Sequence, residues 1–273
     1  MKRFSSRSVF LYNVPMNHQN IWYANHDQRL VAGTTLRHGG LSQPPYATLN
    51  LAFHTGDVIE TVHQNRQRFA DAVQLPLNRM IFTNQSHSIV LKRVTVKDAG
   101  KGSLSYEDGI VADALYTTET KLLLAVFHAD CVPVFIYHPN KPMIAVIHAG
   151  TPGSLNGVTK HAVAQLVKET NLNPNEFIAH LGPSLDFAHH PISEKRSLEL
   201  LTLNPSHGAI IKKIGGSFYL DIPLLNYLQL VEAGLNPMNI HVSNLDTFSN
   251  PSDYFSFDRD QKTGRHVSFI YLK

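Results

Sequence analysis

The sequence predicts a mixed-sheet α+β domain, and three observations favour this class. Short apolar runs rich in β-branched residues recur along the chain, helical patterns separate only some of them, and several runs follow one another without a helix between them. Strict alternation of strands and helices would instead predict a doubly wound parallel sheet. No internal repeat and no Pro/Gly/Ser-rich linker divides the chain, so residues 1–273 are expected to form a single domain.

The strands are predicted from short runs of β-branched and aromatic residues bounded by turn-forming residues. In chain order they cover residues 21–23, 31–36, 80–83, 89–96, 122–127, 134–137, 144–147, 177–181, 240–242 and 267–272. Lys92 and Arg93 interrupt the run at 89–96, and both side chains are expected to be solvated.

The first helix is predicted after Asp57, whose carboxylate is expected to cap it. Helical spacing predicts a buried face made of Val58, Val62, Phe69 and Val73. The polar side chains of Asn65, Arg66 and Arg68 are expected to point away from that face.

Two further helices are predicted at 158–169 and 223–234. Pro223 suits the first turn of a helix, because the N–H that proline lacks has no helical partner there. Gly234 suits the left-handed conformation that commonly ends a helix.

Composition narrows the function classes. With 24 Lys plus Arg against 21 Asp plus Glu, the formal net charge of +3 is too small to predict a nucleic-acid partner. No apolar run approaches the about 18 residues of a membrane helix, and residues 1–15 lack the apolar segment of a signal peptide. The single cysteine, Cys131, excludes an intrachain disulfide and fits a reducing compartment. A cytoplasmic protein without a membrane partner is therefore expected.

Three segments each present a metal-competent side chain at the edge of a predicted strand. These side chains are His87, Cys131 and His148. One thiolate and two imidazoles suit zinc, and three protein ligands leave the fourth tetrahedral position open, as in catalytic zinc sites. The sequence therefore predicts one metal centre with an open position.

Simpler interpretations exist for each ligand. By composition alone, Cys131 is more often a buried inert thiol, and His148 is as readily a core histidine. Asp130 beside Cys131 favours a functional site, because a carboxylate there can orient a ligand or move a proton. Most of the other candidate histidines are expected to be surface or supporting residues; they are His54, His128, His138, His189 and His190.

A competing catalytic interpretation uses Cys131 as a nucleophile and His148 as its base, but it leaves His87 unexplained. Walker, GxGxxG, GxSxG and HExxH motifs are absent. Their absence argues against P-loop ATP hydrolysis, a Rossmann cofactor, an α/β-hydrolase and a zincin.

Short motifs in order along nearly the whole chain resemble those of a known family. They lie at 37–42 (RHGGLS), 45–51 (PYATLNL), 54–57 (HTGD), 65–66 (NR), 84–87 (NQSH), 112–115 (ADAL), 129–134 (ADCVPV), 145–150 (AVIHAG), 182–184 (GPS), 255–260 (FSFDRD) and 263–265 (TGR). The chain resembles the bacterial laccase-domain or polyphenol oxidase family, also described as zinc-dependent purine nucleoside phosphorylases.

The resemblance implies an α/β sandwich of mixed sheets and zinc held by His87, Cys131 and His148. It also implies phosphorolysis of adenosine, inosine or methylthioadenosine, with adenosine deamination as a second activity. The family's older assignment, polyphenol oxidation, implies copper. Zinc is favoured, because oxidation of phenols by oxygen needs several copper ions, whereas one open site suffices for non-redox chemistry. The Irving–Williams order nevertheless predicts that copper binds such a site more tightly than zinc in vitro, so whether copper replaces zinc stays open.

Roles follow for residues within these motifs. Catalytic roles are predicted for Asp130, Cys131 and His54, and contacts with nucleoside or phosphate for Arg37, Asn50, Gln85, Ser184 and Arg265. Phosphate needs an anion cradle, for which the backbone amides of residues 37–40 or 182–184 are candidates, with help from Arg37 or Arg265. The sequence does not predict an oligomeric state.

Some positions differ from the family. Thr151-Pro152 stands where Trp-Arg is usual, Asp186 follows the 182–184 turn where glycine is preferred, and Asp246 replaces a common cysteine. Two alternatives therefore stay open beside the enzyme. One is a catalytically idle module that binds metal or nucleoside, and the other is a metal-free Cys-His hydrolase.

Overall fold

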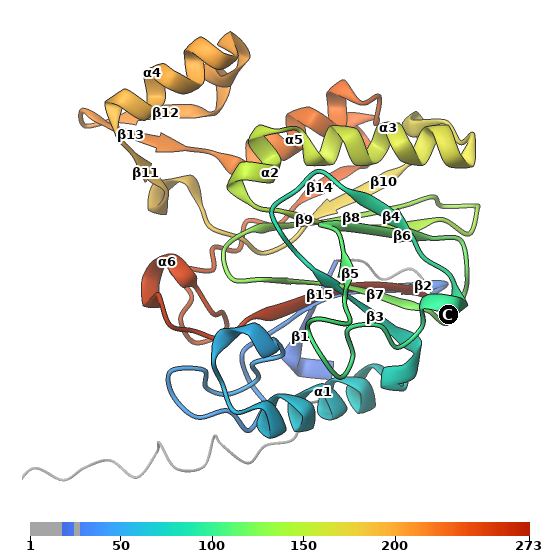
Figure 1. Cartoon of the computed structure of the whole chain (residues 1–273). Coiled ribbons are helices and arrows are strands. Elements are labelled where there is room, and N and C mark those ends of the chain that lie inside the picture. The colour runs from blue at the N-terminus through green and yellow to red at the C-terminus, as the bar shows by residue number, and fades with distance from the viewer. Residues whose placement is uncertain (1–17, 25–27) are drawn as a thin grey trace, which may run out of the picture.

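The computed structural model describes residues 18–24 and 28–273. Two six-stranded sheets stack face to face, and helices cover their outer faces (Figure 1). The absence of a signal-peptide pattern in residues 1–15 concerns a segment outside the described residues. Within the described part, no helix combines the length and apolar character needed to span a bilayer.

The lower sheet in Figure 1 is antiparallel at one side and parallel at the other. β1 pairs with β2, β2 with β15 and β15 with β7 in antiparallel fashion, whereas β7–β3 and β3–β5 are parallel. Its strands, in spatial order, are β1 (Ile21–Tyr23), β2 (Leu30–Thr35), β15 (His266–Leu272), β7 (Leu123–His128), β3 (Met80–Asn84) and β5 (Ile110–Val111). Helix α1 (Ile59–Val73) covers its outer face.

The upper sheet is mixed as well, with parallel pairs at both edges. In spatial order it contains β14 (Ile240–Val242), β10 (Ile178–Leu181), β8 (Val132–Tyr137), β9 (Ile144–Ala149), β6 (Ala114–Thr117) and β4 (Leu91–Arg93). Helices α2 (Thr151–Leu155), α3 (Val158–Thr170) and α5 (Ile222–Glu232) cover its outer face.

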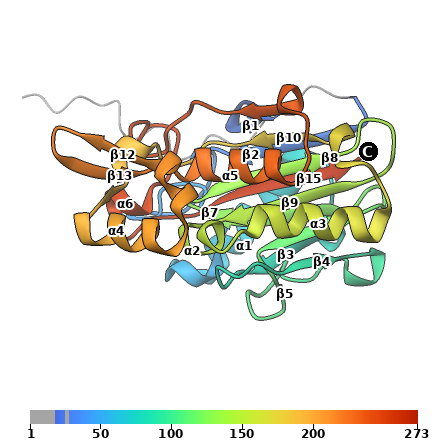
Figure 2. The ribbon, with the colours of Figure 1, turned by 90° about the horizontal axis from the view of Figure 1, so that it is seen from above.

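A smaller sheet projects from one end of the sandwich, on the side where α2 and α6 (Phe257–Asp260) lie (Figures 1 and 2). It consists of β11 (Pro191–Ile192), β13 (Ser217–Leu220) and β12 (Ile211–Ile214), and α4 (Glu194–Leu203) packs against it. Short 3-10 helices connect the elements: η2 (His18–Asn20), η3 (Phe53–Thr55), η4 (Leu77–Arg79), η5 (Val96–Asp98), η6 (Pro174–Glu176), η7 (Phe187–His189), η8 (Pro205–Ile210) and η9 (Pro237–Asn239).

Apolar side chains fill three layers, one between the sheets and one under the helices on each side. All side chains of β7, β8 and β9 are buried, because these strands are covered on both faces. The mixed-sheet α+β sandwich expected from the sequence is confirmed.

The helix predicted at 223–234 is present as α5, and Gly234 follows it with φ +98°. The N–H of Gly234 bonds to the carbonyl of Val231, and that of Leu235 to the carbonyl of Leu230, the pattern of a Schellman motif. The predicted strand at 89–96 was too long, since only β4 is paired. Thr95 and Asp98 form a capping box that starts η5 instead.

The prediction for α1 was wrong at its start and on its polar side. Its N-cap is Val58, which is 60% exposed, and Asp57 does not cap the helix. Asn65 and Arg66 are fully buried, contrary to the prediction. Their side chains bond to backbone groups of residues 41–51 and 102–103, while Nη2 of Arg66 has no hydrogen-bond partner among the described residues and its guanidinium lies over the Phe53 ring.

Candidate metal centre

His87, Cys131 and His148 converge, and their ligand atoms all lie within 4.8 Å of one another. Topology explains this. The parallel strands β3 and β7 end at the same edge, where His87 and Cys131 follow them. The antiparallel register between β8 and β9 pairs Pro133 with His148, so the end of β9 reaches the same place.

Asp113, immediately before β6, holds two of these ligands in position. Its Oδ1 accepts hydrogen bonds from Nδ1 of His148 (2.9 Å) and from the backbone N–H of His87 (3.1 Å). Its Oδ2 accepts from the backbone N–H (2.6 Å) and the hydroxyl (2.7 Å) of Ser88. A His148 ring that donates through Nδ1 presents Nε2 to a metal.

Asp113 received no role in the sequence analysis. Its motif at 112–115 was noticed only as part of the resemblance. The feature that could have identified Asp113 is a carboxylate inside an otherwise apolar segment. A charge buried there requires partners, so it indicates a structural or functional role. Although burial raises the pKa of Asp113, the hydrogen bonds from His148 and Ser88 lower it to about 2.

Gly150 provides the room that a metal needs. A Cβ at this position would lie 2.5 Å from Cδ2 and 3.0 Å from Nε2 of His87, and 3.2 Å from Sγ of Cys131. The donor set of one sulfur and two imidazole nitrogens suits zinc. The three residues therefore fit a zinc ion with an open fourth position.

The Cys131 thiol and the His148 ring shift each other's pKa. Burial alone would raise the pKa of the Cys131 thiol, but His148 and His87 lower it to about 6. Burial would lower the pKa of His148, but the Cys131 thiolate and Asp113 raise it to about 9. A thiolate at neutral pH is the form in which cysteine binds metal.

Asp130 precedes Cys131 and adopts a left-handed conformation with φ 93°. Its Oδ1 accepts from the hydroxyl of Thr247 (2.6 Å) and its Oδ2 from the backbone N–H of Asp258 (2.8 Å). The carboxylate thereby fastens two distant loops to the turn that carries Cys131. Its predicted catalytic role stays a prediction.

His54 lies beside the metal centre in an aromatic setting. Its ring lies 4.4 Å from that of Tyr106 and 5.7 Å from that of Phe127, measured between centroids. Burial and the nearby cations Arg265 and Arg66 lower the pKa of His54 to about 4, so the ring is neutral at pH 7. Tyr106, which sequence reasoning missed, also donates to the backbone carbonyl of Gln85 (3.3 Å).

Three residues predicted to bind substrate have side chains that are hydrogen-bonded within the protein. The guanidinium of Arg37 donates to the carbonyls of Ala47 and Pro251. The amide of Asn50 is fully buried and bonds to Asp57, Thr55 and the backbone. The Gln85 amide bonds to both backbone groups of Phe127. These contacts brace loops around the centre, and substrate contacts by these residues stay predictions.

The 182–184 turn does not offer the anion cradle considered from the sequence. The N–H of Gly182 bonds to the carbonyl of Pro133, and that of Ser184 bonds to the carbonyl of Leu245. Ser184 instead lines a separate cavity.

Arg265 is the predicted phosphate ligand with the more suitable surroundings. The pKa of Arg265 is lowered overall, because burial outweighs the opposing effect of the nearby Cys131 thiolate and Asp130 carboxylate. Its Nη1 donates to the carbonyls of Thr263 and Gly264, which orients the guanidinium. A cation therefore lies within electrostatic reach of the metal ligands.

Comparisons with known proteins identify the family of the chain. The model of the family described as multi-copper polyphenol oxidoreductase laccase matches residues 31–273. Purine nucleoside phosphorylase YlmD of Bacillus subtilis is 36% identical over 250 residues, covering 90% of both chains. The protein of the same name from Geobacillus stearothermophilus is 33% identical over 244 residues, covering 88% of this chain and 89% of the relative.

Solved structures show the same fold. The crystal structure of YlmD from Geobacillus stearothermophilus superposes with a TM-score of 0.89 at 30% identity, covering 95% of this chain and 98% of the other. That of a Bacillus licheniformis hypothetical protein, YfiH, gives 0.85 at 32% identity, covering 89% and 93%.

Proposed function

The chain belongs to the multi-copper polyphenol oxidoreductase laccase family, and from this premise we propose that it is a zinc-dependent purine nucleoside phosphorylase. The observation that carries the proposal is the convergence of His87, Cys131 and His148 within 4.8 Å, with Asp113 fixing their geometry. The names of the curated relatives supply the substrate class.

In phosphorolysis, a phosphate oxygen attacks C1′ of the ribose and the glycosidic C–N bond breaks. The bonding electrons leave with the purine, which gains a proton, and ribose 1-phosphate is the second product. A zinc ion held by the three ligands would supply Lewis-acid stabilisation of negative charge on a substrate oxygen or nitrogen.

The chain's own side chains have separate tasks in this proposal. Arg265 orients the phosphate dianion, because a guanidinium matches phosphate geometry and keeps its charge. His54, neutral at pH 7, accepts or donates a hydrogen bond to the nucleoside without adding charge. Asp130 keeps the Cys131 turn in place through Thr247 and Asp258. Water addition at purine C6, with loss of ammonia from adenosine, is proposed as a second activity.

Zinc is proposed over copper because of the number of metal sites. Among the described residues, one cluster of His, Cys, Asp or Glu side chains meets the geometry of a metal site. Oxidation of phenols by oxygen requires several copper ions, which one such triad does not hold. Copper-dependent polyphenol oxidation would instead show as oxygen consumption with a phenol.

The test is release of free base from inosine, adenosine and methylthioadenosine, with and without phosphate. We expect base only when phosphate is present, and none from the Cys131→Ala variant. Release of inosine from adenosine without phosphate would report the proposed deamination. With zinc bound, the absence of both base and deaminated product would contradict the enzymatic proposal.

Thr151 and Pro152 favour a second candidate, a module that binds nucleoside without turnover. They directly follow Gly150, which contacts the ligand side chains, and they stand where Trp-Arg is usual in the family. This candidate expects nucleoside binding by calorimetry without product. It also expects that the double substitution Thr151→Trp and Pro152→Arg restores activity.

A further inference from the structure

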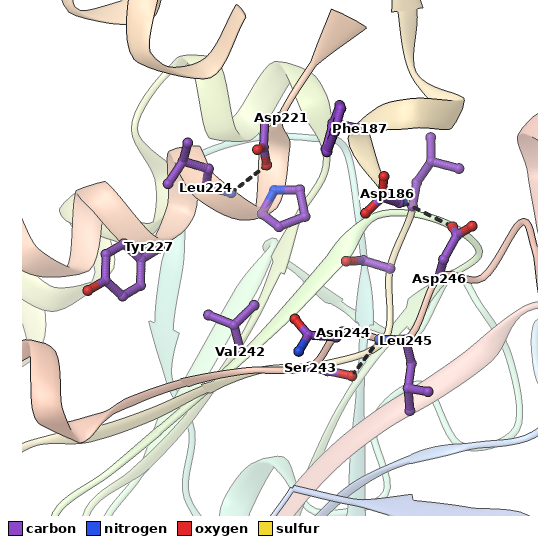
Figure 3. A pocket seen from close by; sticks show the side chains of 13 residues that line it. Asp186, Phe187, Asp221, Leu224, Tyr227, Val242, Ser243, Asn244, Leu245 and Asp246 are labelled. Carbon is purple, nitrogen blue, oxygen red and sulfur yellow. Dashed lines mark hydrogen bonds between the residues drawn. The ribbon is translucent and has the colours of Figure 1, made fainter. Parts of the chain in front are cut away.

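A cavity of about 430 Å³ lies beside the 182–184 turn (Figure 3). Its wall comes from three segments: residues 184–187 after β10, residues 221–227 at the start of α5, and residues 242–246 after β14. None of the metal ligands lines it. Its size is that of a small-molecule site.

Apolar side chains form much of the wall. In Figure 3, Tyr227 and Val242 lie on the side opposite Asp221, Phe187 and Asp186. Val242 is 42% exposed and Leu245 is 39% exposed, so their apolar surface is available to a ligand. Such a wall suits a hydrocarbon chain or ring.

Three carboxylates face this apolar wall, and they differ in how far the protein satisfies them. Asp246 accepts hydrogen bonds from three backbone N–H groups, and its Oδ2 lies 2.9 Å from Nδ1 of His189 without hydrogen-bond geometry. Asp186 accepts from the N–H of Ala188, and Asp221 accepts from the N–H of Leu224, each through Oδ1. The remaining oxygens of Asp186 and Asp221 accept no hydrogen bond from the described residues.

Ser184 gives a second, independent indication of a ligand. It lines the cavity and is only 6% exposed. Its backbone N–H and carbonyl bond to Leu245 and Thr247, but its hydroxyl has no hydrogen-bond partner among residues 18–24 and 28–273. The hydroxyl oxygen is not itself fully enclosed, so a ligand in the cavity can reach it and provide a partner.

The carboxylates that line the cavity favour a positively charged ligand. Burial raises the pKa of Asp221, and the Asp186 carboxylate adds to this, while the Leu224 amide and the Lys212 ammonium oppose it. Lys212 Nζ stays 4.0 Å from Asp221 and donates instead to the carbonyl of Ala209. A bound cation would relieve the repulsion between carboxylates, whereas phosphate would increase it.

We propose that this cavity binds a small organic ammonium ion, a protonated primary amine with a short apolar stem. The three N–H donors of the ammonium match in number the Asp186 and Asp221 oxygens that accept no hydrogen bond from the described residues and the hydroxyl of Ser184. The stem packs against Leu224 and Val242. The site is separate from the metal centre and goes beyond the proposed nucleoside chemistry.

Ligand-observed NMR titration of the full chain with butylammonium chloride tests this site, and butanol serves as the uncharged probe of equal length. We expect saturable binding of butylammonium at low salt and at least about tenfold weaker binding of butanol. The double variant Asp186→Asn and Asp221→Asn should weaken butylammonium binding by about tenfold or more. Asparagine caps helices as well as aspartate does, so both caps are kept.

Asp108→Asn is the matched control, since Asp108 is an exposed carboxylate that does not line the cavity. It should bind butylammonium as the wild type does. Three results would overturn the proposal: no saturation with the wild type, equal affinity for butanol, or unchanged affinity in the double variant with its metal content and circular dichroism intact. None of these readouts uses nucleoside turnover, so the proposed function stands or fails separately.

Discussion

Asp113 connects the fold to the metal ligands, so its replacement gives a residue-scale prediction. In Asp113→Asn the amide cannot accept at both Oδ positions, and the N–H groups of His87 and Ser88 compete for one oxygen. We expect zinc affinity to fall by about 10–100-fold, the usual effect of losing a carboxylate behind a histidine ligand. Competition with a chromophoric chelator measures it.

Asp108→Asn again serves as the control, because this side chain is exposed and makes none of the ligand contacts described above. Unchanged zinc affinity in Asp113→Asn, with the control also unchanged, would show that Asp113 does not hold the ligands.

Gly150 gives a second prediction at this scale. Its φ of −70° is open to any residue, so Gly150→Ala tests space and not backbone strain. The new methyl group would collide with His87 and Cys131. We expect loss of bound metal. The metal-free variant should unfold at nearly the same temperature as the metal-free wild type.

Gly208→Ala is the matched substitution, since a Cβ there meets only Leu201 Cδ2 at an ordinary 3.5 Å. It should keep its metal. Full metal occupancy in Gly150→Ala would mean that the ligands approach the ion from another direction.

Residue type and position at strand ends pointed to the three side chains that the fold brings together, and metal binding by them stays a prediction. The roles of neighbouring residues were not predictable in this way. Gln85 and Asn50 look like free polar groups in the sequence, yet their partners come from Phe127 and from the 263–265 turn. Asp113 became informative only when folding placed it behind His148.

At the scale of elements, helix α5 positions α2, the helix that follows the ligand strand β9. Asn226 of α5 accepts from the hydroxyl of Thr159 (2.6 Å) in α3 and donates to the hydroxyl of Ser154 (2.9 Å) in α2. Gln229 donates to the carbonyl of Ser154 (2.6 Å). Asn226 is fully buried, so these contacts join the three helices away from solvent.

Asn226→Ala should therefore lower the free energy of unfolding by about 1–3 kcal/mol, because two buried hydroxyls lose their partner. Urea unfolding measures the change. Asn175→Ala, at an exposed position, should change it by less than about 0.5 kcal/mol. Equal stability of the two variants would contradict the proposal that the hydrogen bonds of Asn226 hold α2, α3 and α5 together.

Elements with strong patterns were predicted well, and short elements with weak patterns were not. Helices α3 and α5 follow from periodicity and their end residues. Strand β6 was missed because its four residues, ALYT, include only one β-branched residue and so lack the kind of run from which the other strands were predicted. The small sheet β11–β13 was missed because its pairing joins segments of two to four residues.

For the whole molecule, buried neutral histidines predict acid sensitivity. Burial lowers the pKa of His266 to about 3 and that of His180 to about 4, and it also lowers the pKa of His128. In the unfolded chain each imidazole has a pKa of about 6.5. The unfolded chain then binds more protons, so the free energy of unfolding should decrease as the pH falls from about 6.5 towards these folded values.

Urea unfolding at about pH 7 and about pH 5 measures this decrease. The Cys131→Ala background is used, so that metal release does not contribute. His180→Phe should reduce the decrease, since this ring stacks on Tyr137 and a phenyl ring can replace it without titrating. An identical pH dependence with and without His180 would contradict the assignment.

The sandwich brings the ends of β3, β7 and β9 to one edge, and the central claim is that the three side chains gathered there bind zinc. Elemental analysis of the purified, untagged chain by mass spectrometry tests this most directly, with Cys131→Ala as the comparison. We expect about one zinc per chain in the wild type and almost none in the variant. No metal in the wild type, or equal zinc in both proteins, would contradict the account.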